Sequence, residues 1–542
     1  MKKIFPVLLV VIVAFSCKSK TGDDTSDDLD DKGKNVTSRD LSITAANAYS
    51  DLFLDSTDVS AFINSSNLSD KEKRRLLSFY NSRNYQYAWF LTDGLTEHAM
   101  GFYNIYLFDA KHNTDSLTID KKLKRQMDDL FASEHLTIST NNQLIRETEL
   151  RLSKLFIQHG LDVYEDGYVK RKEMERFVPS KKEDVLHIAD SLLNKKHKDN
   201  KYFEDINEPY KLLKIELGRF VQIEKNGGWP TIITSKKIIK KGTNAPVISI
   251  IKKRLAITGD LPSADTSTVF NDSLLNAVKA FQNKYGLTPS GTINQQLVQL
   301  MNIPVKQKIK QLLINLYRMR WMPSLPDGDM ILVNIPEFVL HVMKGKNNVW
   351  DMNVVVGKEG HNTLMFTDDL DQVVFSPYWN LPPSIVINEI LPKMKTNPNY
   401  LASQNFEIVK DGELPEIRQL PGPKNSLGKV KFLFPNSFNI YFHDTNAKSL
   451  FNKDQRAYSH GCIRLSNPQK MAEYLLHDKP EWTPKAIKTA MNASTEKTVK
   501  LKKSVPVFIT YYTAWVDERG NLNFRDDIYG HDKKLQQKMF LN

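Results

Sequence analysis

The sequence predicts a multidomain α+β protein, in which a helical first half and a small three-helix unit precede a β-rich last third. Up to about residue 323, apolar residues recur at three- and four-residue spacing, whereas beyond residue 329 they alternate with a period of two. The chain has 542 residues, of which 41% are hydrophobic, so it can form several domains with separate cores. Its net charge of +12 is spread along the chain, which argues against nucleic acid as a partner and favours anionic polymers or membrane surfaces.

The first 45 residues are predicted to export and anchor the chain. Residues 1–16 hold two lysines and an apolar run from Ile4 to Phe15, which is typical of an export signal. The run is shorter than the roughly 18–20 apolar residues of a membrane-spanning helix. Cys17 follows in an arrangement that resembles the lipobox of bacterial lipoproteins, which implies that Cys17 is lipidated; an ordinary secretory signal is the alternative. Residues 17–45 are polar and acidic, so we expect a lipid-anchored flexible tether.

Residues 46–235 are predicted to form an α-helical scaffold domain. The segments "KEKRRLLSFYNSRNYQYAWF" (71–90) and "NEPYKLLKIELGRFVQI" (207–223) carry apolar residues at helical spacing. The stretch "GGWP" (227–230) ends this pattern, because paired glycines and proline both break helices. No acid–base constellation stands out in this region, so we expect it to have a structural role.

Residues 236–305 are predicted to form three short helices around one small core. Four apolar residues of the middle helix share one stripe: Leu274, Val278, Phe281 and Tyr285. Gly286 is placed to end that helix. The segment "AVKAFQNKYGLTPSGTI" resembles the peptidoglycan-binding three-helix module, and a binding role is implied by this resemblance alone. A connecting helix is expected within residues 306–328.

Residues 329–516 are predicted to form the β-rich domain. "DMILVNIPEFVLHVM" and "VWDMNVVVG" indicate two strands that form a hairpin around residues 345–348. Further strands are expected in "DQVVFSPYWNLP", "NSFNIYFHDT" and "VPVFITYYTAWV", with helices near 384–405 and 467–492. Residues 517–542 are expected to be a C-terminal tail.

Cys462 is the main candidate for chemistry, because it is one of only two cysteines in the chain. With Cys17 lipidated, it has no disulfide partner within the mature chain. A thiol reacts as a thiolate and so needs a neighbouring base, for which His460 and His443 are candidates. In "FNIYFHDT" the period-2 rule places Asn439, Tyr441 and His443 on one face of a strand. His443 and Tyr441 can therefore point together toward an open site.

The residues that follow Cys462 favour a site for acyl chemistry. Asn467 can cap a helix, which would place Cys462 in the turn just before it. Main-chain N–H groups near Gly461 and Cys462 are candidate oxyanion donors, and Arg464 is suited to hold a substrate carboxylate. Two alternatives remain open from the residues alone. Cys462 can be a buried, inert thiol, or it can bind zinc together with nearby side chains, namely His443, Asp444 and His460.

The segment "HDTNAKSLFNKDQRAYSHGCIRLSNP" resembles the signature of the L,D-transpeptidases, with a His-X-Thr segment, a spacer and Ser-His-Gly-Cys-X-Arg. Other stretches resemble the large, scaffold-bearing subclass of this family, namely "VNIPEFVLHV", "VVVGK", "SPYWNLPPSI", "QLPGPKNSLGKVKFLFPN" and "DDIYGHD". One departure is "HNTLMF", in which Leu364 follows Thr363 where the family has proline.

The resemblance implies the roles of the site residues. Cys462 is the nucleophile, His443 is the general base, and Asp444 orients His443 through its backbone. His460 is a supporting group near the oxyanion site, where Ser459 and Gly461 also lie. A substrate groove is formed by three further residues: Tyr441, Trp379 and Arg464. A lid-like insertion over about residues 384–432 covers that groove.

The implied reaction cross-links peptidoglycan stem peptides, donor and acceptor, through 3→3 bonds and a thioacyl-enzyme, with release of terminal D-alanine. No cofactor is needed, because the thioester conserves the energy of the broken amide. Carbapenem-type β-lactams are expected covalent inhibitors. The alternatives are an L,D-carboxypeptidase, a protein–peptidoglycan ligase, or a non-catalytic wall-binding lipoprotein. The expected location is the periplasmic side of the envelope, on the outer membrane through Cys17.

Overall fold

The computed structural model describes residues 36–112, 119–132, 138–164, 177–194, 204, 207–323 and 325–541. The predicted export signal, Cys17 and the first part of the tether lie outside these residues. Within the described ranges, no helix is both long and apolar enough to cross a membrane.

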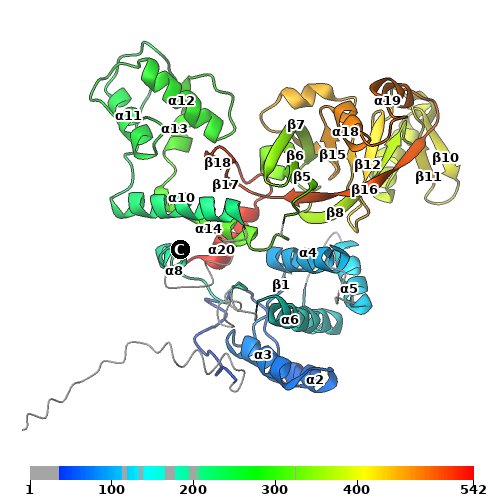
Figure 1. The fold of residues 1–542 in the computed structure, drawn as a ribbon, viewed down its shortest axis with the longest axis horizontal. Helices are drawn as coiled ribbons and strands as arrows, with labels where there is room; N and C mark the ends of the chain where they lie inside the picture. The colour runs from blue at the N-terminus through cyan, green and yellow to red at the C-terminus, as the bar shows by residue number, and fades with distance from the viewer. Residues whose placement is uncertain are drawn as a thin grey trace, which may run out of the picture.

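Helices dominate the first part of the chain (Figure 1). They are α2 (Ser56–Ser65), α3 (Asp70–Asn81), α4 (Glu97–His112), α5 (Lys121–Ala132), α6 (Gln143–Tyr164), α8 (Val185–Leu193) and α10 (Glu208–Lys225). A small hairpin, β1 (Phe90–Leu91) and β2 (Gly94–Leu95), lies among them. The helix predicted over 71–90 is wrong beyond residue 81. Asn84 and Tyr85 adopt positive φ values of 52° and 61°, which an α-helix cannot contain.

A buried carboxylate holds together the centre of this helical region. Glu149 of α6 is fully buried and accepts hydrogen bonds from the Ala88 N–H (2.6 Å), the Trp89 N–H (2.9 Å) and the Tyr80 hydroxyl (3.0 Å). Burial raises the pKa of Glu149 to about 7. The carboxylate thereby fixes the extended segment that carries Trp89 against α3 and α6.

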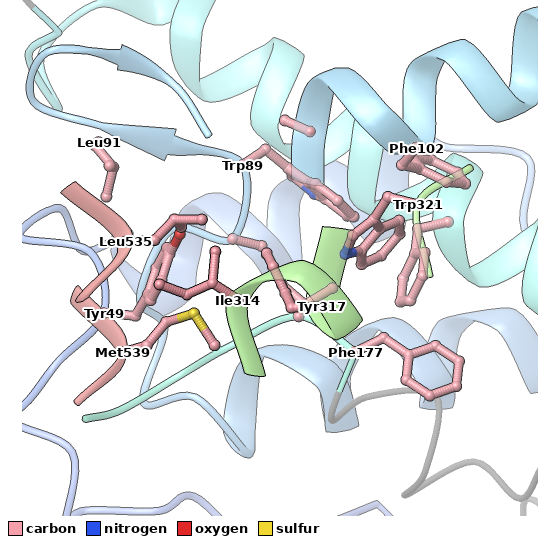
Figure 2. Close-up of a cluster of buried hydrophobic side chains, with 14 of the residues drawn as sticks. Tyr49, Trp89, Leu91, Phe102, Phe177, Ile314, Tyr317, Trp321, Leu535 and Met539 are labelled. Atoms are coloured by element: carbon pink, nitrogen blue, oxygen red, sulfur yellow. The ribbon is translucent and has the colours of Figure 1, made fainter. Parts of the chain in front are cut away.

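The core of the helical region also includes segments from much later in the chain. Helix α14 (Val305–Met319) and helix α20 (His531–Met539) contribute Ile314, Tyr317, Leu535 and Met539 to the same cluster as Tyr49, Trp89 and Phe102 (Figure 2). The short hairpin β17 (Ala514–Val516) and β18 (Leu522–Phe524) packs there as well. The segments that we expected to be a connecting helix and a tail are thus parts of the scaffold core.

An ion-pair network reinforces this junction. The buried Arg318 of α14 donates from Nε to Glu97 of α4 at 2.8 Å, and its Nη1 donates to Asp532 of α20. Because a buried charge is stable only when it is paired, these three residues tie α4, α14 and α20 to one another.

The predicted unit of three short helices is present as α11 (Val247–Ile257), α12 (Asp272–Lys284) and α13 (Gln295–Met301). A short ladder between β3 (Ile238–Ile239) and β4 (Ile293–Asn294) closes it. The predicted stripe of α12 lies in or against its separate apolar core. Helix α12 ends before Gly286, whose φ is 67°, as the sequence predicted.

The last third is built on a large mixed sheet. Its strands are β5 (Asp329–Asn334), β6 (Val339–Lys344), β7 (Asn347–Gly357), β8 (Phe366–Phe375), β12 (Val430–Leu433), β13 (Phe442–His443), β14 (Ala457–Ser459), β15 (Ile463–Leu465) and β16 (Lys497–Thr510). Their order is β14-β7-β15-β13-β12-β8-β16-β5-β6, and β6 also pairs with β7, so the sheet closes on itself around an apolar core. Helices α18 (Pro468–Leu475) and α19 (Pro484–Ala490) follow β15.

Two strand predictions need correction. Residues 329–343 form β5 and β6 rather than one strand, because a 3-10 turn at Ile335–Glu337 and Phe338 at φ 61° reverse the chain. The predicted strand in "NSFNIYFHDT" shortens to β13, because Asn439 has a φ of 54° and lies in the left-handed region.

An insertion between β8 and β12 forms a small subdomain of its own. It contains β9 (Trp379–Asn380), α15 (Pro383–Ile385), the π-helix η2 (Val386–Ile390), α16 (Leu391–Thr396), α17 (Tyr400–Ser403), β10 (Phe406–Lys410) and β11 (Glu416–Gln419). Strands β10, β11 and β9 form a separate sheet over a core that includes Leu381, Val386 and Ile417. The insertion ends before residue 430 rather than at 432, because β12 belongs to the main sheet.

Candidate active site

Cys462 lies at the end of a tight turn between β14 and β15. The Ser459 hydroxyl organises this turn, because it donates to the Cys462 carbonyl at 2.5 Å and accepts from the Gly461 N–H at 3.2 Å. Gly461 has a φ of 112°, which a residue with a side chain rarely adopts. Asn467 caps α18 as predicted, but β15 separates Cys462 from that helix, so Cys462 does not directly precede it.

The same turn decides which main-chain donors remain open. The Gly461 N–H, expected to face a substrate, is occupied by Ser459. The Cys462 N–H, in contrast, donates to no protein acceptor within the described part of the chain. Of the two expected oxyanion donors, only Cys462 is therefore free in this structure.

Thr363 supports the turn from the neighbouring loop. Its buried hydroxyl donates to the Gly461 carbonyl at 2.7 Å and accepts from the Gly357 N–H at 2.9 Å. The Tyr529 hydroxyl in turn donates to the Gly357 carbonyl at 2.6 Å. A Cβ at Gly357 would lie 2.0 Å from the His361 carbonyl oxygen, so only glycine fits there.

His443 is held on β13 by its neighbour's backbone. Its Nδ1 lies 2.5 Å from the Asp444 carbonyl oxygen. Because a carbonyl can only accept, Nδ1 carries the hydrogen and Nε2 is the basic nitrogen. The Asp444 carboxylate is engaged elsewhere, with Lys448 Nζ at 2.6 Å and the Lys429 N–H at 2.9 Å. Asp444 therefore contacts His443 through its main chain, in the geometry that the resemblance implied.

Sheet register places the thiol and the imidazole on one face. Strands β13 and β15 run parallel, with Phe442 opposite Ile463 and His443 opposite Arg464. Phe442 and Ile463 point into the apolar core. The residues that alternate with them, Tyr441, His443, Cys462 and Arg464, consequently share the other face. The Cα atoms of Cys462 and His443 are expected to be roughly 8 Å apart at this register, which side chains can span.

Burial keeps both members of this pair neutral at rest. It lowers the pKa of His443 to about 4, and the nearby Arg464 charge acts in the same direction. Burial also raises the pKa of the Cys462 thiol to about 11, although hydrogen bonds from Tyr441 and the charge of Arg464 oppose this. The resting pair is thus a protonated thiol and a neutral imidazole, and proton transfer must accompany attack.

Arg464 is the unsatisfied charge of the site. Burial lowers the pKa of its guanidinium, while the neighbouring Cys462 acts to raise it. Its Nε is buried and has no hydrogen-bond partner within the described residues. A buried donor without a partner is costly, so this position is suited to an incoming acceptor group.

His460 lies at the rim of the site and faces the insertion. Its Nε2 is 3.1 Å from Glu389 Oε1 of η2, and its ring packs edge-on against His361 at 4.8 Å. The pKa of His460 is lowered, chiefly by burial, with Glu389 opposing and His361 adding to the effect. His460 therefore joins the turn of Cys462 to the insertion.

Trp379 belongs to the insertion rather than to the strands that carry the catalytic candidates. It begins the sheet of the insertion as part of β9 and packs within the small core of that subdomain, against Phe406 at 6.4 Å. Its contribution to a substrate groove stays a prediction.

The four side chains weighed as zinc ligands have separate partners. His443 bonds to the Asp444 carbonyl, Asp444 to Lys448, His460 to Glu389 and Cys462 to the Asn439 carbonyl. In the residues that the structure describes, no three His, Cys, Asp or Glu side chains are gathered to hold a metal ion.

Several contributors to the site were missed from the sequence. The sequence around Glu389 does not distinguish it from a solvent-exposed glutamate on a helix. The Asn439 carbonyl, which accepts from the Cys462 thiol at 3.5 Å, is a main-chain group that no side-chain pattern reports. Tyr529 lies in the stretch "DDIYGHD", whose resemblance to the family was the available signal. Leu364, the departure from the family, packs against the core of the sheet.

Three parts of the chain match known protein families. The model of the L,D-transpeptidase catalytic domain matches residues 328–507, that of a scaffold domain matches 74–217, and that of a "Putative peptidoglycan binding domain" matches 244–301. A Haemophilus influenzae protein named "Putative L,D-transpeptidase" is 31% identical over 291 residues, which are 50% of this chain and 57% of that protein. The chain thus spans little more than half the length of this relative.

Solved structures give much weaker alignments. An L,D-transpeptidase from Mycobacterium smegmatis has 14% identity and a TM-score of 0.19, covering 34% of this chain and 58% of its own. One from Stackebrandtia nassauensis has 12% identity and a TM-score of 0.21, covering 51% and 97%. TM-scores this low support no assignment, so the comparison rests on the sequence matches. Residues 328–507 match the L,D-transpeptidase catalytic domain, in one chain with matches to a scaffold domain and to the "Putative peptidoglycan binding domain", which agrees with the predicted resemblance.

Proposed function

We propose that the protein is a peptidoglycan L,D-transpeptidase that forms 3→3 cross-links through a thioester on Cys462, with His443 as general base. The observation that carries the proposal is the shared face of β13 and β15. There a half-buried thiol, a neutral imidazole and an unpaired guanidinium nitrogen lie within a matched L,D-transpeptidase domain.

In the first half-reaction, the sulfur of Cys462 attacks the carbonyl carbon of the third residue of a donor stem. His443 Nε2 accepts the thiol proton as the C–S bond forms, because the thiol is protonated at rest. The Cys462 N–H is available to the developing oxyanion. The bond to terminal D-alanine then breaks, His443 returns the proton to the leaving amine, and a thioester remains.

In the second half-reaction, the side-chain amine of an acceptor stem attacks the thioester carbonyl. His443 takes a proton from this amine and delivers it to the leaving sulfur of Cys462, so the thiol is regenerated and an amide has formed. No energy source is required, since the thioester retains the free energy of the broken peptide bond. The unpaired Nε of Arg464 is suited to hold an anionic group of a stem, and Tyr441 lies beside the sulfur.

Mass spectrometry of the intact protein with meropenem tests the nucleophile. We expect one covalent adduct per chain, and its loss in Cys462→Ala. A freshly reduced wild-type chain that forms no adduct would contradict the proposal. Incubation with purified sacculi then identifies the acceptor: 3→3 dimers indicate cross-linking, whereas trimmed tripeptides alone would indicate a carboxypeptidase.

We propose further that residues 1–16 direct export and that Cys17 anchors the protein by lipid on the periplasmic side of the outer membrane. The support is the order of charged, apolar and cysteine residues at the start of the sequence. Membrane fractionation tests this: the wild-type chain should sediment with outer membranes and Cys17→Ala should not.

A further inference from the structure

The thiol of Cys462 is oriented by a loop that precedes β13. It donates to the Asn439 carbonyl at 3.5 Å. Asn439 is exposed and has a φ of 54°, so its carbonyl points away from the direction that an extended strand would give it. The rotamer of the nucleophile therefore depends on where this loop lies.

Asn436 makes the loop a single rigid unit. Its Nδ2 donates to the carbonyls of Phe434 and Ile440, both at 2.7 Å. Its Oδ1 accepts from the N–H groups of Phe438 (3.0 Å) and Ile440 (3.2 Å). Because both ends of the loop are tied to one side chain, a contact made anywhere on its outer surface also locates Asn439.

That outer surface is held by the scaffold domain. Helix α5 lies below the catalytic sheet (Figure 1). Its Phe131 packs against Phe438 with ring centroids 4.7 Å apart, and its Asp128 accepts from the Ser437 hydroxyl at 2.6 Å. A polar and an aromatic contact thus fix two successive loop residues from a helix about 300 positions earlier.

A row of packed aromatic rings extends from the contact between Phe131 and Phe438 to the strand that carries His443. Phe438 packs on Phe366 at 5.0 Å, Phe366 on Phe434 at 5.9 Å, and Phe434 on Phe442 at 4.8 Å. Phe442 is buried and directly precedes His443 on β13. Since packed aromatic rings resist displacement, the row links the position of Phe131 to that of the strand that carries the base.

We infer that Phe131 and Asp128 of α5 are positioning residues for the catalytic pair: the scaffold domain sets the geometry between Cys462 and His443 through the loop of residues 434–440. This inference rests on the proposed function, in which Cys462 is acylated. Loss of the contact at Phe131 leaves the substrate groove in place but lets the loop, Asn439 and the start of β13 shift relative to the sulfur.

Saturation kinetics of acylation of the full chain by meropenem, followed by intact mass, test the inference. In Phe131→Ala we expect the limiting rate constant to fall about tenfold or more, because small misplacements of reacting groups have effects of this size. The half-saturating concentration should change little. Phe131→Leu, which refills most of the space, should restore most of the rate. Ser437→Ala, at an exposed position, should give a smaller fall in the same rate constant.

Lys111→Ala is the matched control. Lys111 on α4 joins the scaffold to β8 through Asp368 (3.0 Å) and Asp369 (2.7 Å) and does not touch the loop. We expect an unchanged limiting rate. A wild-type rate in Phe131→Ala, or an equal fall in Lys111→Ala, would overturn the inference. If Phe131→Ala does not fold, unchanged rates in both Ser437→Ala and Asp128→Asn would overturn it instead.

A second reagent separates the two proposals. Suppose that the wild-type chain does not react with meropenem, while iodoacetamide alkylates Cys462 more slowly in Phe131→Ala than in wild type. This result would overturn the proposed function and would still support the positioning of the thiol. Acylation of wild type and Phe131→Ala at equal rates would support the function and overturn the positioning.

Discussion

The buried Glu149 cluster of the scaffold and the Cys462–His443 pair of the sheet domain both contain ionisable groups whose pKa is shifted by burial. They differ in what is left unpaired. Both oxygens of Glu149 accept hydrogen bonds, and its side chain is closed to solvent. The pair, in contrast, has a half-buried thiol beside an Arg464 nitrogen without a partner. A shifted pKa therefore does not by itself indicate chemistry, whereas an accessible nucleophile beside an unsatisfied donor does.

The largest expected effect comes from removing the base. His443→Ala should slow acylation of Cys462 by meropenem about 10²- to 10⁴-fold, since this is the usual contribution of general acid–base catalysis. Stopped-flow or quenched mass measurements give the rate. A threefold change in rate corresponds to about 0.6 kcal/mol, which indirect effects can cause. An acylation rate within threefold of wild type would therefore show that the Cys462–His443 pair is structural, like the Glu149 cluster, rather than catalytic.

The two clusters should respond to pH with opposite sign. The folded pKa of Glu149, about 7, lies above its ordinary value of 4.5, so the folded state gains stability as pH falls from 7 toward 4.5. The folded pKa of His443, about 4, lies below 6.5, so stability is lost as pH falls from 6.5 toward 4. Each contribution is on the order of 3 kcal/mol.

Unfolding midpoints between about pH 4 and 8 measure these contributions. On acidification, the stability difference between wild type and Glu149→Gln should change in favour of wild type. The stability difference between wild type and His443→Gln should change in favour of the variant. The same direction for both variants would mean that one of the two environments is wrongly described.

At constant pH, Glu149→Gln should affect the stability of the protein but not its acylation rate. The amide places a donor where two N–H groups and a hydroxyl now donate, so we expect a destabilisation of about 1–3 kcal/mol. Thermal unfolding of the full chain measures it. Acylation by meropenem of the chains that remain folded should be unchanged, because no contact of Glu149 reaches the catalytic face. A fall comparable with that of His443→Ala would remove the distinction between the regions.

The smallest effect concerns the support of the turn. Tyr529→Phe removes the hydrogen bond to the Gly357 carbonyl and should destabilise the protein by about 1 kcal/mol, with a modest loss of acylation rate. Tyr103→Phe is the control, because the Tyr103 hydroxyl is buried with no partner among the described residues. This variant should be neutral or slightly stabilised. Equal destabilisation of both would argue against the support of the turn by Tyr529.

The spacing of apolar residues correctly predicted the helices that bury one face along their whole length. Helices α10, α12 and α14 and the turn at Gly286 follow directly from apolar spacing and helix-ending residues. The failures occur where single residues leave regular backbone geometry. Asn84 and Tyr85 end a helix that spacing would continue, and Asn439 shortens the strand of His443. Asparagine adopts positive φ more readily than most residues, but the sequence does not say which asparagine will do so.

For the site, the sequence predicted side chains more successfully than main-chain partners. The common face of Tyr441 and His443 was predicted from alternation, although the strand that carries them is shorter than expected. The occupied Gly461 N–H, the Asn439 carbonyl and the contact between His460 and Glu389 depend on how distant segments meet. Such tertiary contacts leave no periodic trace in the sequence, so no pattern could report them. The roles of the individual site residues stay predictions.

The junction of α4, α14 and α20 has a consequence for biosynthesis. The apolar cluster that begins at Tyr49 includes Phe540, and Arg318 pairs with Asp532, which lies 214 residues later. Synthesis proceeds from the N-terminus, so a ribosome-bound chain lacks these partners until α20 has emerged. The nascent protein therefore keeps an unfinished hydrophobic centre until α20 is available. Were the chain exported as proposed above, this unfinished centre would keep it in a form that a translocation channel can thread.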